Sequence, residues 1–224
     1  MKRFLLFCCA VATLQGFSSC SSSQPNTEYG WLKNAIDTSV QQLEETVADV
    51  GDSVLLPRSI WTGYDMDFLC RQLQRDPATF KDSLRIKPVK DAIGTRRYCS
   101  SIYDWTSGFF PGELWYMYEY TKDDFWKKKA EFQTELLEPL KSYKGTHDLG
   151  FMLYCSYGNG YRMEQSDKYK QVLLEGANSL ASRFNPVVGC IRSWDHNGDK
   201  WQYPVIIDNM MNLEFLFWAT KASG

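Results

Sequence analysis

Three segments of this chain share a plan that favours an all-helical fold. Each places an aspartate just ahead of a strongly apolar run of helical length, and these aspartates are Asp104, Asp148 and Asp208. Amphipathic stretches alternate with them, at 31–50, at 123–140, and at 166–184 with Ser166 as N-cap. This alternation is expected of helical hairpins in two rings. The very apolar helices form the buried inner ring, and the amphipathic helices form the outer ring, with one face exposed to solvent. If the inner helices run the same way, the three aspartates gather at one end.

One stretch departs from the helical pattern. The sequence "VVGCIRSWDHNGDKWQYPVIID" carries β-branched residues on both sides of Asn197-Gly198. An Asn-Gly pair between such runs is a strong hairpin signal. The pattern therefore predicts a small β-hairpin near 187–207, close to the end at which the aspartates gather.

Composition excludes some functions and leaves others open. The 224 residues are 44% hydrophobic and 15% aromatic, with a net charge of −2. The absence of a basic stripe argues against a nucleic-acid partner. The aromatic residues suit either a carbohydrate-handling protein or simply a well-packed helical core. The four cysteines beyond residue 20 lack metal-ligand spacing, so we expect no metal site and mainly buried thiols, with disulfide pairing left open: Cys70, Cys99, Cys155 and Cys190.

The N-terminus has the pattern of a secretory signal. "MKRFLLFCCAVATLQGFSSC" begins with two basic residues, continues with a short apolar segment, and ends in small residues before Cys20. The ending "FSSC" resembles a bacterial lipobox, which implies cleavage before Cys20 and lipidation of its sulfur. We therefore expect a signal peptide at 1–19, a lipidated tether at 20–30 and a helical domain at 31–224. This organisation predicts a membrane-anchored protein of the bacterial cell envelope, periplasmic or on the outer membrane.

The chemistry expected from the residues is that of paired carboxylates. The chain has no GxSxG elbow, phosphate loop or GxGxxG motif. If Asp148 and Asp208 converge in a partly dry cavity, both cannot ionise freely, and one becomes a general acid. The apolar residues after Asp208 suggest a dry setting that keeps its carboxyl group protonated. An N-cap role for either aspartate is the alternative. His147 is either a contact to a ligand or a capping or packing histidine.

Four motifs in order resemble one enzyme family. "DWTSGFFPGELW", "HDLGF", "SW" at 193–194 and "DNMMNLEFLFWA" resemble the unsaturated glucuronyl hydrolases, glycoside hydrolase family 88. The resemblance implies an (α/α)6 barrel, of which this chain would be the first half. It implies that Asp208 is the general acid/base and that Asp148 is the second essential aspartate. It also implies that Trp105, Trp194 and His147 contact the sugar, with no metal or organic cofactor.

The implied reaction removes a 4,5-unsaturated uronic acid from the non-reducing end of oligosaccharides that lyases leave, of the glycosaminoglycan type. Asp208 would protonate C4 of the vinyl ether, and water would add at C5. Because the motifs cover about half of the expected barrel, we expect a fragment or truncated frame whose activity by itself is in question. Two alternatives stay open: an unsaturated rhamnogalacturonyl hydrolase, and a non-catalytic helical glycan-binding lipoprotein.

Overall fold

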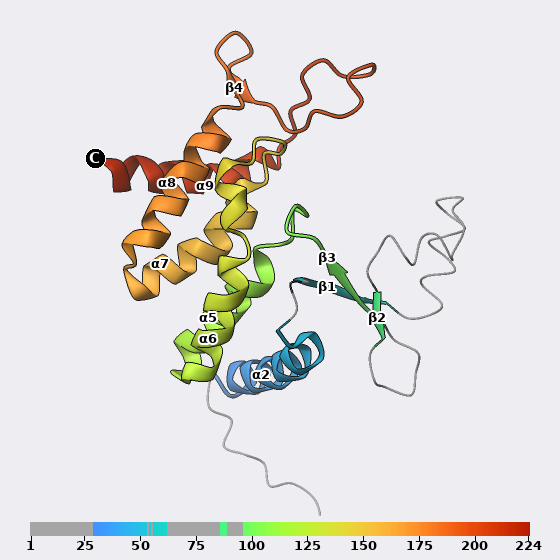
Figure 1. The fold of residues 1–224 in the computed structure, drawn as a ribbon, viewed down its shortest axis with the longest axis vertical. Coiled ribbons are helices and arrows are strands. Elements are labelled where there is room, and N and C mark those ends of the chain that lie inside the picture. The colour runs from blue at the N-terminus through green and yellow to red at the C-terminus, as the bar shows by residue number, and fades with distance from the viewer. Residues whose placement is uncertain (1–28, 53, 55, 62–85, 89–95) are drawn as a thin grey trace, which may run out of the picture. The chain divides into compact units, whose positions relative to one another are not determined.

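The computed structural model describes residues 29–52, 54, 56–61, 86–88 and 96–224 (Figure 1). The chain divides into two units after Gln42. The described part of the first unit is the beginning of helix α2 (Gly30–Val50), which confirms the helix expected at 31–50. The signal peptide at 1–19, Cys20 and Cys70 lie outside the described residues.

The second unit, Leu43–Gly224, contains a succession of helices. They are α5 (Phe109–Thr121), α6 (Asp124–Glu135), the 3-10 turn η1 (Glu138–Ser142), the π-helix η2 (Gly150–Gly158), α7 (Asn159–Glu164), α8 (Asp167–Ala181) and α9 (Asn209–Ser223). Ser166 caps α8, since its hydroxyl accepts a hydrogen bond from the N–H of Tyr169 at 3.4 Å. The helices expected at 123–140 and 166–184 are thus confirmed, the first one as α6 followed by η1.

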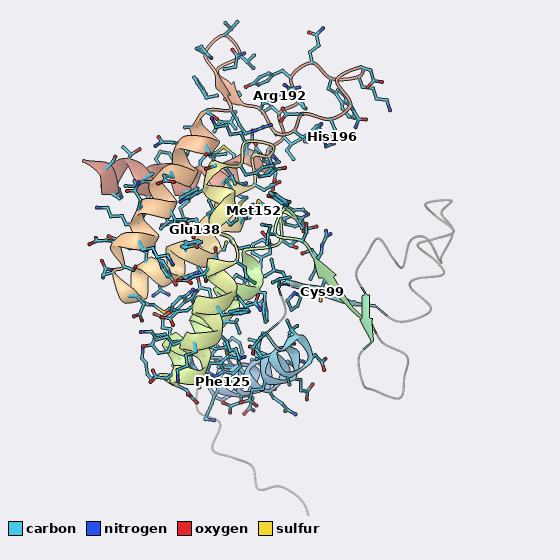
Figure 2. The ribbon with its side chains drawn as sticks, viewed as in Figure 1. Cys99, Phe125, Glu138, Met152, Arg192 and His196 are labelled. Atoms are coloured by element: carbon cyan, nitrogen blue, oxygen red, sulfur yellow. The ribbon has the colours of Figure 1, made fainter. Side chains whose placement is uncertain are left out.

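The very apolar elements form an inner row. Helix η2 packs against α5 on one side and against α9 on the other, while α6 packs on α5, and α8 packs on η2 and α9. Met152 of η2 lies inside this packed group (Figure 2). The core includes large side chains that are essentially inaccessible to solvent: Trp115, Leu149, Met152, Leu153, Tyr157, Leu173, Leu180 and Phe215. The predicted division into inner apolar and outer amphipathic helices is therefore confirmed for these elements.

Two glycines let the inner helices approach closely. A Cβ on Gly112 of α5 would lie 2.7 Å from the carbonyl oxygen of Cys155 in η2. A Cβ on Gly150 would lie 2.8 Å from the Cα of Asn212 in α9. Contacts this short require the backbones to separate. The packing of η2 against α5 and against α9 therefore requires glycine at these two positions.

We expect Gly150→Ala to lower the free energy of unfolding by about 1–3 kcal/mol, because the added methyl group meets backbone that cannot rotate away. Urea unfolding followed by far-UV circular dichroism measures the effect. Gly198→Ala is the matched control, since a Cβ there meets no atom within 4 Å. Equal midpoints for the two variants would contradict the close packing of η2 on α9.

The chain also contains strands that the all-helical expectation omits. Strands β1 (Leu56–Trp61), β2 (Ile86–Pro88) and β3 (Arg96–Ser100) form an antiparallel sheet in the order β1-β3-β2. The pairing is irregular between Pro57 and Ser59. Such short strands, paired across a long stretch of chain and interrupted by a proline, leave no readable alternation in the sequence.

The hairpin expected near 187–207 is wrong in its position. The strands are β4 (Phe184–Asn185) and β5 (Cys190–Ile191), so the reversal lies before the Asn197-Gly198 pair. The side chain of Asn185 accepts from the N–H groups of Val187 and Val188, and Gly189 takes a φ of +75°. These features make the tight turn. The polar stretch around Asn197 instead forms an exposed loop.

No helix in the described ranges combines the length and hydropathy needed to cross a bilayer. Among the cysteines in those ranges, Cys99 is buried, Cys155 is half-buried, and Cys190 is exposed. Burial raises the pKa of the Cys155 thiol to about 11. The expectation of buried thiols therefore holds for Cys99 and, in part, for Cys155, but not for Cys190.

Candidate active site

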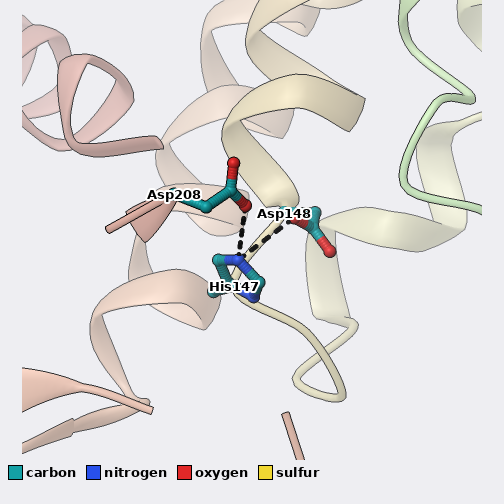
Figure 3. A group of neighbouring side chains, drawn as sticks. All are labelled: His147, Asp148 and Asp208. Atoms are coloured by element: carbon teal, nitrogen blue, oxygen red, sulfur yellow. Dashed lines mark hydrogen bonds and ion pairs between the residues drawn. The ribbon is translucent and has the colours of Figure 1, made fainter. Parts of the chain in front are cut away.

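Three side chains predicted from sequence meet at one end of the inner row (Figure 3). His147 Nε2 lies 2.8 Å from Asp208 Oδ2 and 3.4 Å from Asp148 Oδ1. His147 and Asp148 directly precede Leu149 and η2, and Asp208 directly precedes α9. The convergence of the two carboxyl groups, expected from the sequence, is confirmed.

Packing between the two helix starts holds these residues together. The side-chain oxygen of Asn212, one turn into α9, accepts a hydrogen bond from the N–H of Phe151 at 3.0 Å. That N–H belongs to the first turn of η2, where no partner exists within the helix. The contact therefore ties the beginning of η2 to α9 and sets the spacing between Asp148 and Asp208.

Asp104 does not join the cluster. Its Oδ2 accepts from the guanidinium of Arg58 at 2.8 Å, and its Oδ1 accepts from the N–H and hydroxyl groups of Thr106. The carboxyl group of Asp104 thus forms an ion pair with Arg58 and stabilises the turn at Thr106. The expectation that all three aspartates gather is wrong for this one.

The hydrogen bonds of His147 fix which of its nitrogens carries a proton. His147 Nδ1 lies 2.7 Å from the carbonyl oxygen of Ser193, which only accepts, so Nδ1 must donate. A neutral ring then presents the lone pair of Nε2 to Asp208, whose carboxyl group must supply the proton of that bond. A charged ring instead donates to an Asp208 carboxylate. In both cases one proton lies between Nε2 and Oδ2.

Asp148 is the more buried of the two carboxyl groups. Its side chain is 14% exposed, whereas that of Asp208 is 38% exposed. Burial raises the pKa of Asp148, against a hydrogen bond from the Thr146 hydroxyl at 2.5 Å and the positive charges of His147 and Arg183; Asp208 adds to the increase. The prediction of a dry setting for Asp208 is therefore wrong in this structure, since its side chain is 38% exposed.

The apolar residues around Asp208 do not enclose it. Ile207, Met210 and Met211 are all exposed, and Phe217 farther along α9 is exposed as well. An apolar run in sequence does not decide which way each side chain points. Asp208 does occupy the N-cap position of α9, but it has helical backbone angles and makes no side-chain cap. Its carboxyl group is directed to His147 instead.

The raised pKa of Asp148 leads us to expect that the free energy of unfolding depends on pH. The pKa is raised on folding, so the folded state holds the proton more tightly than the unfolded chain. Stability from this group is present below the unfolded pKa and is lost as pH rises through the folded pKa. We therefore expect Asp148→Asn, which cannot ionise, to unfold at higher urea concentration than wild type at pH 7. The gain should disappear at acidic pH, and a gain that is constant across pH would contradict this interpretation.

The two tryptophans expected at the sugar site flank the cluster. Trp105 is 45% exposed and packs against Phe109 of α5 and Phe151 of η2, with ring centroids 5.8 and 5.9 Å apart. Trp194 follows Ser193, pairs with Thr146 in a β-bridge and stacks on His196 at 5.4 Å. His196 and Arg192 lie in the loop region beyond α8 (Figure 2). Trp105 thus contacts a residue three positions after Asp148, and Trp194 pairs with the residue directly before His147.

Sequence reasoning missed the residues that support the cluster. The Ser193 carbonyl fixes His147, and Arg183, at the end of α8, holds the neighbouring loop through Asp195. The "SW" motif at 193–194 contains Ser193, but its carbonyl is a group that every residue has. Arg183 lies just beyond the amphipathic helix α8, and no sequence pattern marks it.

The same cluster has a spacing that a metal ion can also use, since one ligand atom each of His147, Asp148 and Asp208 lies within 4.8 Å of the others. The 2.8 Å bond between Nε2 and Oδ2 is already accounted for by a shared proton. We therefore interpret the cluster as an acid–base site.

Comparison with solved structures defines the class of fold. The structure of an unsaturated glucuronyl hydrolase specific for heparin matches with a TM-score of 0.66 and 40% identity, over 86% of this chain and 43% of that one. The enzyme from Bacillus sp. GL1 matches with a TM-score of 0.63 at 22% identity, which bears on the fold alone. The helical hairpins described above are thus part of an (α/α)6 barrel, the fold of a class of glycosidases.

Sequence relatives narrow this class to one family. An unsaturated glucuronyl hydrolase from Formosa agariphila is 54% identical over 122 residues, or 54% of this chain and 30% of the relative. An unsaturated chondroitin disaccharide hydrolase from Streptococcus pneumoniae is 28% identical over 172 residues, or 72% of this chain and 41% of the relative. A model described as a domain of unknown function matches residues 1–75. The chain is therefore related to the unsaturated glucuronyl hydrolases, and it spans less than half the length of the relatives it matches.

Proposed function

We propose that this chain carries the acid–base half of an unsaturated glucuronyl hydrolase, which releases a 4,5-unsaturated uronic acid from lyase-generated oligosaccharides. The observation that carries the proposal is the hydrogen bond between His147 Nε2 and Asp208 Oδ2, in a site that also holds Asp148. This arrangement holds one proton where a nearby vinyl ether can receive it.

The proposed chemistry is a hydration. Asp208, protonated, gives its proton to C4 of the unsaturated ring, and positive charge develops at C5 and the ring oxygen. Water then adds to C5 and returns a proton to the Asp208 carboxylate, so the enzyme is regenerated. The hemiketal at C5 opens, and the glycosidic oxygen leaves with the shortened sugar. One water is consumed, and no oxidant or metal is required.

The geometry of the cluster supports the role of Asp208 as both general acid and general base. The Asp208 oxygen that faces away from His147 is available to a substrate, while the other oxygen stays hydrogen-bonded to the ring (Figure 3). His147 can stabilise Asp208 in both protonation states, because Nε2 can accept or donate. Asp148 lies beside the pair and accepts from the Thr146 hydroxyl with Oδ2. In this proposal its carboxyl group holds a sugar hydroxyl.

We propose glycosaminoglycan fragments as the substrates, bound against the exposed ring of Trp105 and the half-buried ring of Trp194. Aromatic rings with one open face suit the apolar face of a sugar. Relatives are named for chondroitin disaccharides, and one related structure is described as specific for heparin. These names favour glycosaminoglycan substrates over the rhamnogalacturonan alternative.

The test is an assay with unsaturated disaccharides produced from chondroitin and from heparin by lyases. Loss of the double bond's ultraviolet absorbance reports hydration. The protein is purified from its native cells, and its size is read by blotting with an antibody against residues 166–184. We expect turnover of at least one disaccharide. Binding without any loss of absorbance would favour the glycan-binding alternative.

For location, we propose an anchor at Cys20 in the bacterial cell envelope. The lipobox-like "FSSC" and the polar residues after it support this proposal. Cys20→Ser should move the protein from the membrane fraction to the soluble fraction. Retention in the membrane fraction would contradict the anchor.

A further inference from the structure

Two buried polar residues connect the two ends of the acid–base pair. Asn209 directly follows Asp208, and its side-chain oxygen accepts from the hydroxyl of Ser193 at 3.1 Å. The carbonyl of Ser193 in turn accepts from Nδ1 of His147 at 2.7 Å, and Nε2 of His147 contacts Asp208 at 2.8 Å. The four residues thus form a closed ring, in which Asp208 and Asn209 are joined covalently and the other links are hydrogen bonds.

Each supporting residue is held by further hydrogen bonds. The Asn209 amide donates to the carbonyl of Ile191 at 2.6 Å. Ser193 donates its N–H to Pro204 O at 2.8 Å, and its hydroxyl accepts from the N–H of Ile206 at 3.1 Å. Ser193 is completely buried, and Asn209 is nearly so. Because these bonds use side-chain and backbone groups together, the Ser193 carbonyl has little freedom to move away from His147.

We propose that Ser193 and Asn209 are positioning residues for the acid–base pair. They hold the Ser193 carbonyl against His147, so that Nδ1 is the donor and Nε2 faces Asp208. A ring with the opposite tautomer would place a hydrogen on Nε2 and a lone pair against the carbonyl oxygen. Asp208 would then meet a donor even when the ring is neutral, and it would be held as a carboxylate that cannot protonate C4.

The charged groups around the ring are few among the described residues. Asp148 faces Nε2 from the segment before η2, and Asp208 faces it from the start of α9. Arg183, at the end of α8, acts on Asp148 and is itself paired with Asp195. None of these charges lies at Nδ1, where the Ser193 carbonyl is the partner. The orientation of the ring therefore depends on that carbonyl.

The proposal is tested by nuclear magnetic resonance of the full chain with 15N-labelled histidine. The sequence has only two histidines, so the spectrum contains His147 and His196 alone. Couplings between ring nitrogens and ring protons distinguish the two neutral tautomers. In wild type we expect Nδ1 of His147 to carry a proton, because the Ser193 carbonyl oxygen can only accept. A wild-type ring that is protonated on Nε2 instead would overturn the proposal without any variant.

Ser193→Ala removes the hydroxyl that links Asn209 to the backbone around residue 193. We expect His147 to populate both tautomers in this variant. This part of the proposal rests on the proposed function: kcat for the unsaturated disaccharide should fall on the order of 10- to 100-fold with KM nearly unchanged, and its pH profile should shift. Ser193→Thr, which keeps the hydroxyl, should restore the wild-type tautomer.

Ser156→Ala is the matched control, because Ser156 is also completely buried and its hydroxyl only donates to carbonyls within η2. A single Nδ1–H tautomer together with a wild-type pH profile in Ser193→Ala would overturn the proposal. If Ser193→Ala does not fold, Asn209→Ala removes the same link, and the wild-type spectrum still decides. Absence of turnover in wild type would overturn the proposed function, while the tautomers would still test the positioning.

Discussion

Asp208→Asn is expected to lower kcat for an unsaturated disaccharide by about 10²–10⁴-fold, the usual contribution of a general acid. Asparagine is nearly the same size as aspartate, and its amide can still contact Nε2 of His147, so the helix start and the cluster should keep their geometry. It has no proton that it can transfer to C4 and take back from water. KM should therefore change little.

The control for this experiment is Asp199→Asn. Asp199 is an exposed aspartate in the loop after Trp194, so the same chemical change is made at a position away from the cluster. The measurement is the initial rate of absorbance loss at saturating substrate, with far-UV circular dichroism to confirm that both variants fold. Wild-type turnover in Asp208→Asn would show that another group supplies the proton.

Asp195→Ala is expected to reduce the free energy of unfolding by about 2–4 kcal/mol. The Arg183 side chain is only 5% exposed, and its guanidinium forms two hydrogen bonds with Asp195, at 2.9 and 3.3 Å. The same guanidinium also donates to the carbonyls of Lys144 and Arg192. Removal of the carboxylate leaves a buried positive charge without a counterion. The lower end of the range reflects the 49% exposure of Asp195.

The pH dependence of this variant follows from the same pair. The hydrogen bond from Arg183 lowers the pKa of Asp195, so the stability from the ion pair is present above the unfolded pKa, near 3.8. It is lost as pH falls through the folded pKa. The difference between wild type and Asp195→Ala in urea unfolding should therefore shrink at acidic pH. Asp199→Ala is the control, and an equal loss of stability in both variants would show that the Arg183 pair contributes nothing specific.

The sequence was sufficient to predict the helical hairpins and the convergence of Asp148 with Asp208. Both predictions follow from patterns of residue types in the sequence, namely apolar periodicity, a capping serine, and aspartates placed ahead of apolar runs. The prediction that Asp104 joins the other two aspartates was wrong, because no sequence pattern indicates its ion pair with the distant Arg58. The hairpin was misplaced because Asn185 and Gly189, and not Asn197-Gly198, form the turn between the two paired strands.

Other features could not be read from side-chain patterns. The π-helical turns of η2 have the same apolar composition as an α-helix. The exposure of Asp208 depends on which way Met210 and Met211 point, which sequence order does not specify. The hydrogen bond that orients His147 comes from a backbone carbonyl, and a carbonyl has no sequence signature.

The ring that joins His147, Ser193, Asn209 and Asp208 has an evolutionary consequence. Positions 193 and 209 should not drift independently among homologues, because a lineage that loses the serine hydroxyl leaves the asparagine oxygen without its donor. Substitutions at the two positions should therefore occur together on a phylogenetic tree. They should be rarest in lineages that retain the histidine at position 147.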